Sequence, residues 1–229
     1  MDVLRKIATD RRFHRMVGIG VLSLAGLVLW AWRSGIDLAT LKDAWRGVEA
    51  FLRVRPWLLF AGLVLLPAFP VPVSPLFFLV GTVWSERPLV ACGICLLGMG
   101  LNMAWTYWLA ARPGRGLVER LLARMNVRVP ELPQNNHVQM ILILRLTPGM
   151  PFFIQNYVLG FLRVGFLPYV GISMACSGLV ACGVVLSGAG VSDGNLVPVM
   201  TGAGLIVLGV VVLQVVRKKV LKPRTVAKP

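Results

Sequence analysis

Two apolar segments of this chain are interrupted by prolines, and the interruptions limit how each segment can cross a membrane. The first segment covers residues 56–84 and the second covers residues 140–160. The breaks are Pro67, Pro70, Pro72 and Pro75 in the first, and Pro148 and Pro151 in the second. Proline removes a backbone donor and ends a helix, and neither half of the first segment reaches the roughly 20 residues that a spanning helix needs. We therefore predict two re-entrant helical hairpins, with a single kinked helix as the alternative for the first.

The composition is that of a membrane protein. The 229 residues are 57% hydrophobic and only 14% charged, whereas about 25% of residues are charged in a soluble domain. Four apolar runs are long enough to span the bilayer, and they cover residues 16–32, 89–111, 166–186 and 196–216. The spacing of apolar and charged residues predicts an amphipathic surface helix over 36–52 and a short interfacial helix over 117–125.

The formal net charge is +15. The basic residues are distributed along the chain as in a membrane protein and not as in a nucleic-acid-binding surface. Basic residues lie between the apolar runs, and no RNA-recognition, zinc-finger or helix-turn-helix pattern accompanies them, so we expect no nucleic-acid partner. If neither hairpin crosses the membrane, the amino-terminal tail, the arginine-rich linker after residue 111 and the carboxyl-terminal tail share one face. The positive-inside rule then places both termini in the cytoplasm. The basic residues between 33 and 55 are the exception to this pattern.

The hairpins and spans form a repeat. A hairpin followed by a span covers residues 57–111, and the same order recurs over residues 138–188. The two units enter the membrane from opposite sides, as in inverted-repeat transporters. We predict an all-α membrane protein with about four transmembrane helices and two opposed re-entrant hairpins. Its parts are residues 1–56 (basic tail, first span and surface helix), 57–190 (hairpin core) and 191–229 (last span and basic tail).

Arg145 is a single cation inside the second broken segment. A guanidinium that faces lipid costs from about 2.5 to over 10 kcal/mol, so polar groups must meet it. No hairpin or span interior contains a carboxylate that could do so. The candidates are carbonyls freed by Pro148 and Pro151, the amides of Gln155 and Asn156, water, and an anion. An arginine fork suits phosphate, and the alternative is that Arg145 only clamps carbonyls of the opposite hairpin.

The sequence favours no catalytic or metal chemistry. Cys92 and Cys95 match a C-x-x-C pattern, but they lie in an apolar run with many small residues, so we expect helix packing rather than redox or metal binding. No carboxylate pair, Ser/His/Asp set or metal-ligand cluster occurs in the apolar segments. We expect a protein that is not an enzyme and that uses no cofactor or metal.

Four groups of residues carry a resemblance to a known family. They are Pro67 to Pro72 running on to Gly81, Tyr107 to Gly114, Leu144 to Pro148, and Pro151-Phe152 with Asn156-Tyr157 and Gly160. Over about residues 57–190 the chain resembles the DedA/VTT-domain superfamily of SNARE-associated Golgi protein-like membrane proteins, and within it the branch related to the yeast Golgi protein. The resemblance implies two facing re-entrant loops and the movement of phospholipid or polyprenyl-phosphate headgroups across the bilayer. Many members carry an acidic residue in the first hairpin, whereas residues 56–85 contain none, which favours an uncoupled, scramblase-like mode.

We therefore expect a lipid flippase or scramblase in a bacterial inner membrane, acting on membrane lipids with anionic phosphate headgroups. Substrate contact is expected at Arg145, Asn156 and Gln155. The residues expected to shape the hairpins are Pro67, Pro70, Pro72, Pro75, Gly81, Pro148, Pro151 and Gly160. An ion-coupled small-anion permease and a non-transporting membrane organiser are the alternatives. The sequence predicts no particular oligomeric state.

Overall fold

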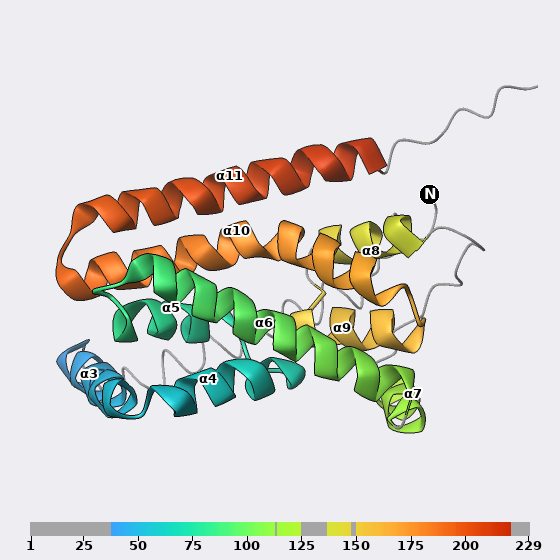
Figure 1. Cartoon of the computed structure of the whole chain (residues 1–229), viewed down its shortest axis with the longest axis horizontal. Helices are drawn as coiled ribbons and strands as arrows, with labels where there is room; N and C mark the ends of the chain where they lie inside the picture. Colours follow the sequence, from blue (N-terminus) through green and yellow to red (C-terminus); the bar gives the residue numbers. More distant parts are fainter. Residues whose placement is uncertain (1–37, 113, 125–136, 148–149, 221–229) are drawn as a thin grey trace, which may run out of the picture. The chain divides into compact units, whose positions relative to one another are not determined.

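The computed structural model describes residues 38–112, 114–124, 137–147 and 150–220, and its regular structure there is helical. In chain order the elements are α3 (Leu38–Val54), α4 (Pro56–Leu65), the 3-10 turn η1 (Leu66–Ala68), α5 (Ser74–Val83), α6 (Pro88–Ala111), α7 (Arg115–Arg124), α8 (His137–Leu146), α9 (Phe152–Phe161), α10 (Phe166–Asp193) and α11 (Leu196–Val220) (Figure 1). The predicted first span at 16–32 lies outside the described residues. The chain divides into two compact units, residues 1–50 with 221–229, and residues 51–220. The second unit contains both hairpins.

Among the described residues, three helices are long and apolar enough to cross a membrane, and they confirm the three later predicted spans. They are α6, α10 and α11. α10 continues beyond its predicted end at Leu186, because the added residues are mostly small or polar and do not register as an apolar run. α3 and α7 are helices over nearly the same residues as the two predicted surface helices. α3 and α4 together are also apolar enough to pass as one span, but the helices bend by 103° at the break between them.

The first hairpin consists of α4, η1 and α5, joined by the non-helical residues 69–73. Pro67 lies in η1, Pro70 and Pro72 lie in the link, and Pro75 lies in the first turn of α5. A proline in the first turn of a helix disrupts nothing, because the backbone N–H there has no helical partner. The four prolines therefore stop one helix and start the next.

The second hairpin consists of α8 and α9, each ten residues long. Pro151 directly precedes α9 with φ −57° and ψ 144°, an extended conformation that a continuing helix cannot adopt. Pro148 lies outside the described residues. The predicted break between the two arms is confirmed by the helix bounds.

The first hairpin begins and ends at the same end of its unit. Arg53, which precedes α4, donates hydrogen bonds to the carbonyl oxygens of Thr82 and Val83 in the last turn of α5. It also donates to Ser192 Oγ, in the last turn of α10, at 3.1 Å. The start of α4 and the end of α5 therefore lie together beside the C-terminal end of α10.

The second hairpin begins and ends at the other end of α10. The backbone N–H of Gly165, directly before α10, donates to Nδ1 of His137, the first residue of α8, at 3.1 Å. α9 ends at Phe161, just before this turn, and Arg163 within the turn donates to the carbonyl oxygen of Ala111 at 3.2 Å. The start of α8, the end of α9 and the end of α6 thus lie beside the N-terminal end of α10.

The length of α10 separates the two hairpin bases across the membrane. Its 28 residues give a length of about 42 Å, which exceeds the roughly 30 Å of the hydrocarbon core. A ten-residue arm is about 15 Å long and reaches only about halfway. The structure therefore confirms two re-entrant hairpins that enter from opposite sides.

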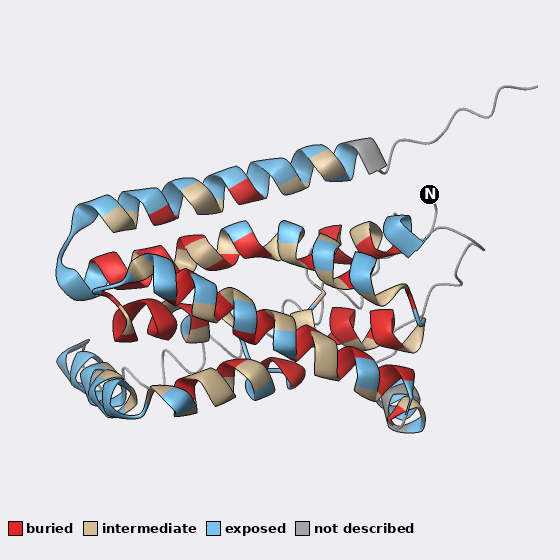
Figure 2. Ribbon diagram, in the orientation of Figure 1, coloured by how far each residue is buried: buried red, intermediate tan, exposed pale blue. Residues whose placement is uncertain are grey.

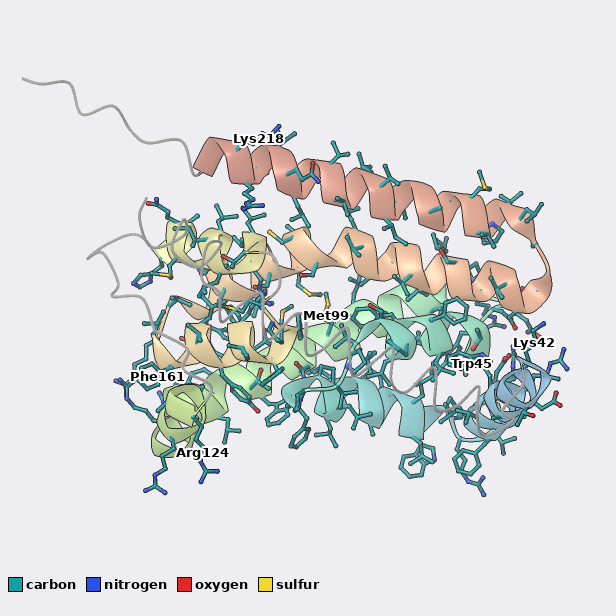
Figure 3. The ribbon with its side chains drawn as sticks, turned by 180° about the vertical axis from the view of Figure 1, so that it is seen from behind. Lys42, Trp45, Met99, Arg124, Phe161 and Lys218 are labelled. Atoms are coloured by element: carbon teal, nitrogen blue, oxygen red, sulfur yellow. The ribbon has the colours of Figure 1, made fainter. Side chains whose placement is uncertain are left out.

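The two repeats pack against each other reciprocally. α5 packs along α10 and α9 packs along α6, so the second arm of each hairpin lies on the span of the other repeat. A Cβ atom on Gly81 would lie 2.0 Å from the carbonyl oxygen of Val185, and one on Gly160 would lie 2.7 Å from that of Tyr107. Buried residues gather between these helices, whereas α11 is largely exposed (Figure 2). Met99 of α6 lies in this interior (Figure 3).

We expect Gly81→Ala to destabilise the protein, because its methyl group would overlap the backbone of α10. Overpacking of this kind costs about 1–3 kcal/mol, which should lower the melting temperature of the purified protein in detergent. Gly93→Ala on α6 is the matched control, since no atom lies within 4 Å of the methyl group added there. Equal melting temperatures for the two variants would contradict the close contact between α5 and α10.

Candidate functional site

Arg145 lies near the C-terminal end of α8, directly before the break in the second hairpin. Its Nε donates to Ser173 Oγ at 2.8 Å. Its Nη1 donates to Gln155 Oε1 at 3.0 Å, and its Nη2 donates to Asn156 Oδ1 at 2.7 Å. The break turns the chain back, so the end of α8 meets the first turns of α9. The guanidinium is held from three directions by neutral oxygens of α9 and α10.

These contacts solvate the charge of Arg145 without neutralising it. α4, α5, α6, α8 and α9 contain no Asp or Glu, and the single acidic residue of α10 is its last, Asp193. Two aromatic rings add attraction, since the guanidinium carbon lies 5.1 Å from the ring centre of Phe152 and 5.6 Å from that of Tyr169. We call the place where Arg145 meets Gln155, Asn156 and Ser173 the junction. It has a positive potential that favours an anion.

Hydrogen bonds connect Arg145 to the first hairpin through α6. Asn156 Nδ2 donates to Asn102 Oδ1 at 3.2 Å, and Asn102 Nδ2 donates to the carbonyl oxygen of Val64 at 2.7 Å. Trp105 Nε1 donates to the same carbonyl at 2.8 Å. Val64 lies in the last turn of α4, where carbonyl groups lack helical partners. One series of side chains thus joins α8, α9, α6 and α4.

A second contact joins the two hairpins directly. The hydroxyl of Tyr157, on α9, donates to the carbonyl oxygen of Ala68, in η1, at 3.0 Å. Gln155 is fixed on its other side, because its Nε2 donates to the carbonyl oxygen of Met150 at 2.9 Å. The side chains at the hairpin tips therefore satisfy backbone carbonyls that the helix breaks expose.

Arg145 is covered in this conformation. Its side chain is 8% exposed, and Asn156 is fully buried. The sequence left open whether Arg145 meets a headgroup or clamps carbonyls of the opposite hairpin. Among the described residues its partners are two amides and a hydroxyl, and the link to the opposite hairpin passes through Asn102. Contact with a headgroup at Arg145 would require the junction to open.

The structure brings together the three residues predicted for the site, Arg145, Gln155 and Asn156. Asn102 and Ser173 also belong to the site, although they were not predicted there. Each had a signal that could have been used, because each is a polar side chain inside a long apolar span, and such residues usually face the protein interior. Both are fully buried.

The cysteines of the apolar spans lie at a helix contact. Cys92 and Cys95 are buried on α6, and Cys92 Sγ lies 3.9 Å from the carbonyl oxygen of Cys182 on α10. In the part of the chain that the structure describes, no three His, Cys, Asp or Glu side chains gather closely enough to hold a metal ion.

We expect Asn102→Ala to destabilise the junction, because it removes a partner from both Asn156 and the Val64 carbonyl. A buried polar group left without its partner costs about 1–3 kcal/mol. Thermal unfolding in detergent measures the loss, with Gln214→Ala as the control, since Gln214 is an exposed amide on the apolar helix α11. If Asn102→Ala and the control had equal melting temperatures, this series of hydrogen bonds would not contribute to the stability of the protein.

Comparison with known proteins identifies the family. Residues 69–190, more than half of the chain, match the family model of the VTT domain. Searches of curated proteins and of solved structures found no match. The matched range includes the break of the first hairpin, α5, α6, the second hairpin and nearly all of α10. This chain therefore belongs to the VTT-domain family of integral membrane proteins, within the DedA/SNARE-associated Golgi protein superfamily.

Proposed function

We propose that this chain moves lipids with anionic phosphate headgroups, such as phospholipids or polyprenyl phosphates, between leaflets through the junction of its two hairpins. One observation carries the proposal: neutral oxygens hold the guanidinium of Arg145 where two half-membrane hairpins meet. An arginine fork donates two parallel hydrogen bonds to phosphate and keeps its charge. The VTT family is associated with lipid transport and is generally not enzymatic. This supports lipid transport as the general function.

In this proposal Arg145 contacts the lipid phosphate. Gln155 and Asn156 hold the guanidinium while the junction is closed, and phosphate oxygens take their place when a headgroup enters. Carbonyls and amides at the helix breaks provide the polar path. The acyl chains stay in the lipid, so only the headgroup needs such a path.

Opening of the junction is part of the proposal, because Arg145 is only 8% exposed. The contacts to be separated are that of Tyr157 with Ala68 of the first hairpin and that of Asn156 with Asn102 of α6. Each neutral hydrogen bond contributes about 1 kcal/mol net, so an open state can exist as a minor population. The hairpins contain no Asp or Glu that could carry a coupled proton, which supports a scramblase-like mode.

We place the basic linker and both termini in the cytoplasm, in a bacterial inner membrane, from the positive-inside rule. We further propose the branch related to the yeast Golgi protein within the superfamily, on the residues that carry the resemblance. Neither assignment affects the chemistry at Arg145.

We expect Arg145→Lys to fold and to lose lipid translocation. A lysine ammonium keeps the charge, but it cannot donate along the fixed directions of a guanidinium fork. Loss of charge-assisted hydrogen bonds worth about 1.5–3 kcal/mol should slow translocation by at least about tenfold. The measurement uses purified protein in liposomes that contain a phospholipid with a fluorescent headgroup, and an added quencher reports exposure in the outer leaflet.

The control for lost stability is Gly183→Ala. Its methyl group would lie 2.7 Å from the carbonyl oxygen of Gly202 on α11, so it weakens packing away from the hairpins. Translocation per folded molecule should be close to wild type in this control. Wild-type translocation in Arg145→Lys, or uptake of inorganic phosphate without lipid exchange, would contradict the proposal; the second result would indicate a small-anion permease.

We expect Tyr157→Phe to speed translocation. The substitution keeps the ring and removes the hydrogen bond to the Ala68 carbonyl, so it favours separation of the hairpin tips. A net contribution of about 0.5–1.5 kcal/mol corresponds to an increase of roughly two- to tenfold in the open population. The same liposome assay measures the rate. An unchanged or slower rate would contradict separation of this contact during transport.

A further inference from the structure

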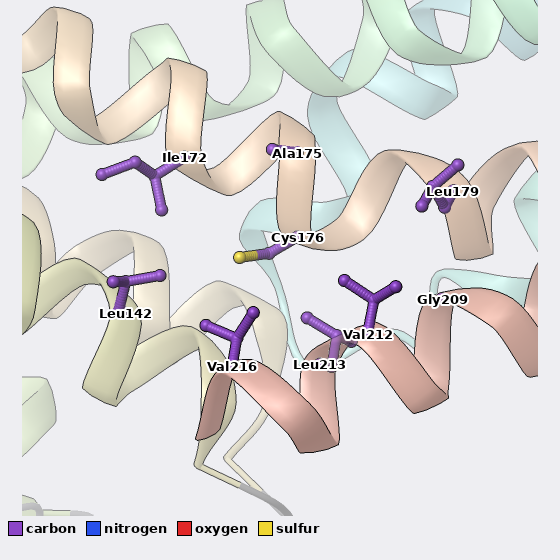
Figure 4. A pocket seen from close by; sticks show the side chains of 9 residues that line it. All are labelled: Leu142, Ile172, Ala175, Cys176, Leu179, Gly209, Val212, Leu213 and Val216. Carbon is purple, nitrogen blue, oxygen red and sulfur yellow. The ribbon is translucent and has the colours of Figure 1, made fainter. Parts of the chain in front are cut away.

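A cavity of about 250 Å³, partly open to the surface at Ala175, Leu179 and Val212, lies between α8, α10 and α11 (Figure 4). Its lining side chains are apolar, apart from the thiol of Cys176. A buried water needs two to four polar partners, and this lining does not supply them. The exposed residues of the lining belong to α10 and α11, which are long and apolar enough to span a membrane, so the open side faces hydrocarbon. A hydrocarbon chain therefore fits the lining of this cavity.

Glycines close one end of the cavity and set its shape. Toward the start of α11, Gly202 and Gly209 bring α11 close to α10, and a Cβ on Gly209 would lie 2.8 Å from Val180 Cγ2. Beyond Gly209 the cavity extends to Val216 and to Leu142 of α8 (Figure 4). The cavity thus has an inner end at Gly209 and extends toward the C-terminal end of α11.

The outer end of the cavity is followed by basic residues. Arg217 and Lys218 come directly after Val216 and are exposed, and Figure 3 shows Lys218 at this end of α11. Surface cations of this kind attract anionic lipid headgroups. An apolar cavity with cations beyond one end complements a molecule that has an anionic head and a hydrocarbon tail.

The cavity also adjoins the polar junction. Leu142, in its wall, is three residues before Arg145 on α8, and Cys176 is three residues after Ser173 on α10. Residues three apart share a helix face, and Arg145 Nε is hydrogen-bonded to Ser173 Oγ. The cavity is therefore one helical turn from the guanidinium on both α8 and α10.

We propose that this cavity binds one hydrocarbon chain of an anionic lipid, with the chain running from Val216 toward Gly209 and the headgroup at Arg217 and Lys218. The inference rests on the proposed lipid transport and adds a site for the tail of the substrate. A lipid held there has its headgroup at the membrane surface and its chain one helical turn from Arg145.

Photolabelling tests the proposal on the full chain in liposomes. The probe is phosphatidic acid with a diazirine on one acyl chain, and mass spectrometry of peptides locates the adducts. Adducts are expected within residues 172–179 and 209–216. Ala175→Phe fills the cavity and should remove them, whereas Ala203→Phe, at an exposed alanine of α11 outside the cavity, should leave them unchanged. Equal labelling of the two variants, or adducts spread evenly along α11, would overturn the proposal.

The headgroup is tested with the double variant Arg217→Gln, Lys218→Gln. Labelling by phosphatidic acid should fall by roughly fivefold for each cation removed, while labelling by a phosphatidylcholine probe with the same chain should not change. Equal labelling of the wild type by the two probes would contradict a preference for an anionic headgroup at Arg217 and Lys218. Translocation is measured on the same liposomes: adducts without translocation would refute the proposed function alone, and wild-type translocation with equal adducts in Ala175→Phe and Ala203→Phe would refute the tail site alone.

Discussion

A buried guanidinium that no carboxylate of the surrounding helices can reach is the constraint on which this structure depends. Arg145 needs several neutral oxygens at once, because a single hydrogen bond does not replace the hydration of a charge. The oxygens come from Gln155 and Asn156 on the returning arm of its own hairpin and from Ser173 on a span. Asn156 is in turn held by Asn102, which is anchored on the first hairpin. Solvation of one charge thus fixes the relative positions of α8, α9, α10, α6 and α4.

Small residues make this arrangement possible. The second arm of each hairpin packs on the span of the other repeat, and Gly81 and Gly160 stand where the backbones approach closely. Between helices in lipid, close packing and hydrogen bonds replace the hydrophobic effect as the source of association. The same reciprocal packing brings the hairpin tips together, so that the Tyr157 hydroxyl meets the Ala68 carbonyl. The fold therefore places these polar groups where the tips of the two hairpins meet.

Much of the fold was predictable from the sequence, because spanning length and proline breaks are local properties. The grouping of Arg145 with Gln155 and Asn156 was also predictable, since all three flank one break. The inward orientation of Asn102 and Ser173 was predictable from their polarity, but their partners were not, because those partners come from helices that are distant in the chain. The burial of Arg145 could not be predicted from the sequence either, because it depends on how two distant hairpins pack against each other. The end of α10 was misjudged because its last turns are made of small residues rather than large apolar ones.

The opposed entry of the two hairpins is tested most directly by measuring on which side of the membrane each hairpin begins and ends. Single cysteines at Arg55 and Glu86 flank the first hairpin, and single cysteines at His137 and Arg163 flank the second, in a chain whose four native cysteines are replaced. A membrane-impermeant maleimide, applied to one side of oriented vesicles, reports which positions are accessible. The structure predicts that positions 55 and 86 react from one side and positions 137 and 163 from the other. Reaction of 55 and 86 from opposite sides, or of all four from the same side, would contradict it.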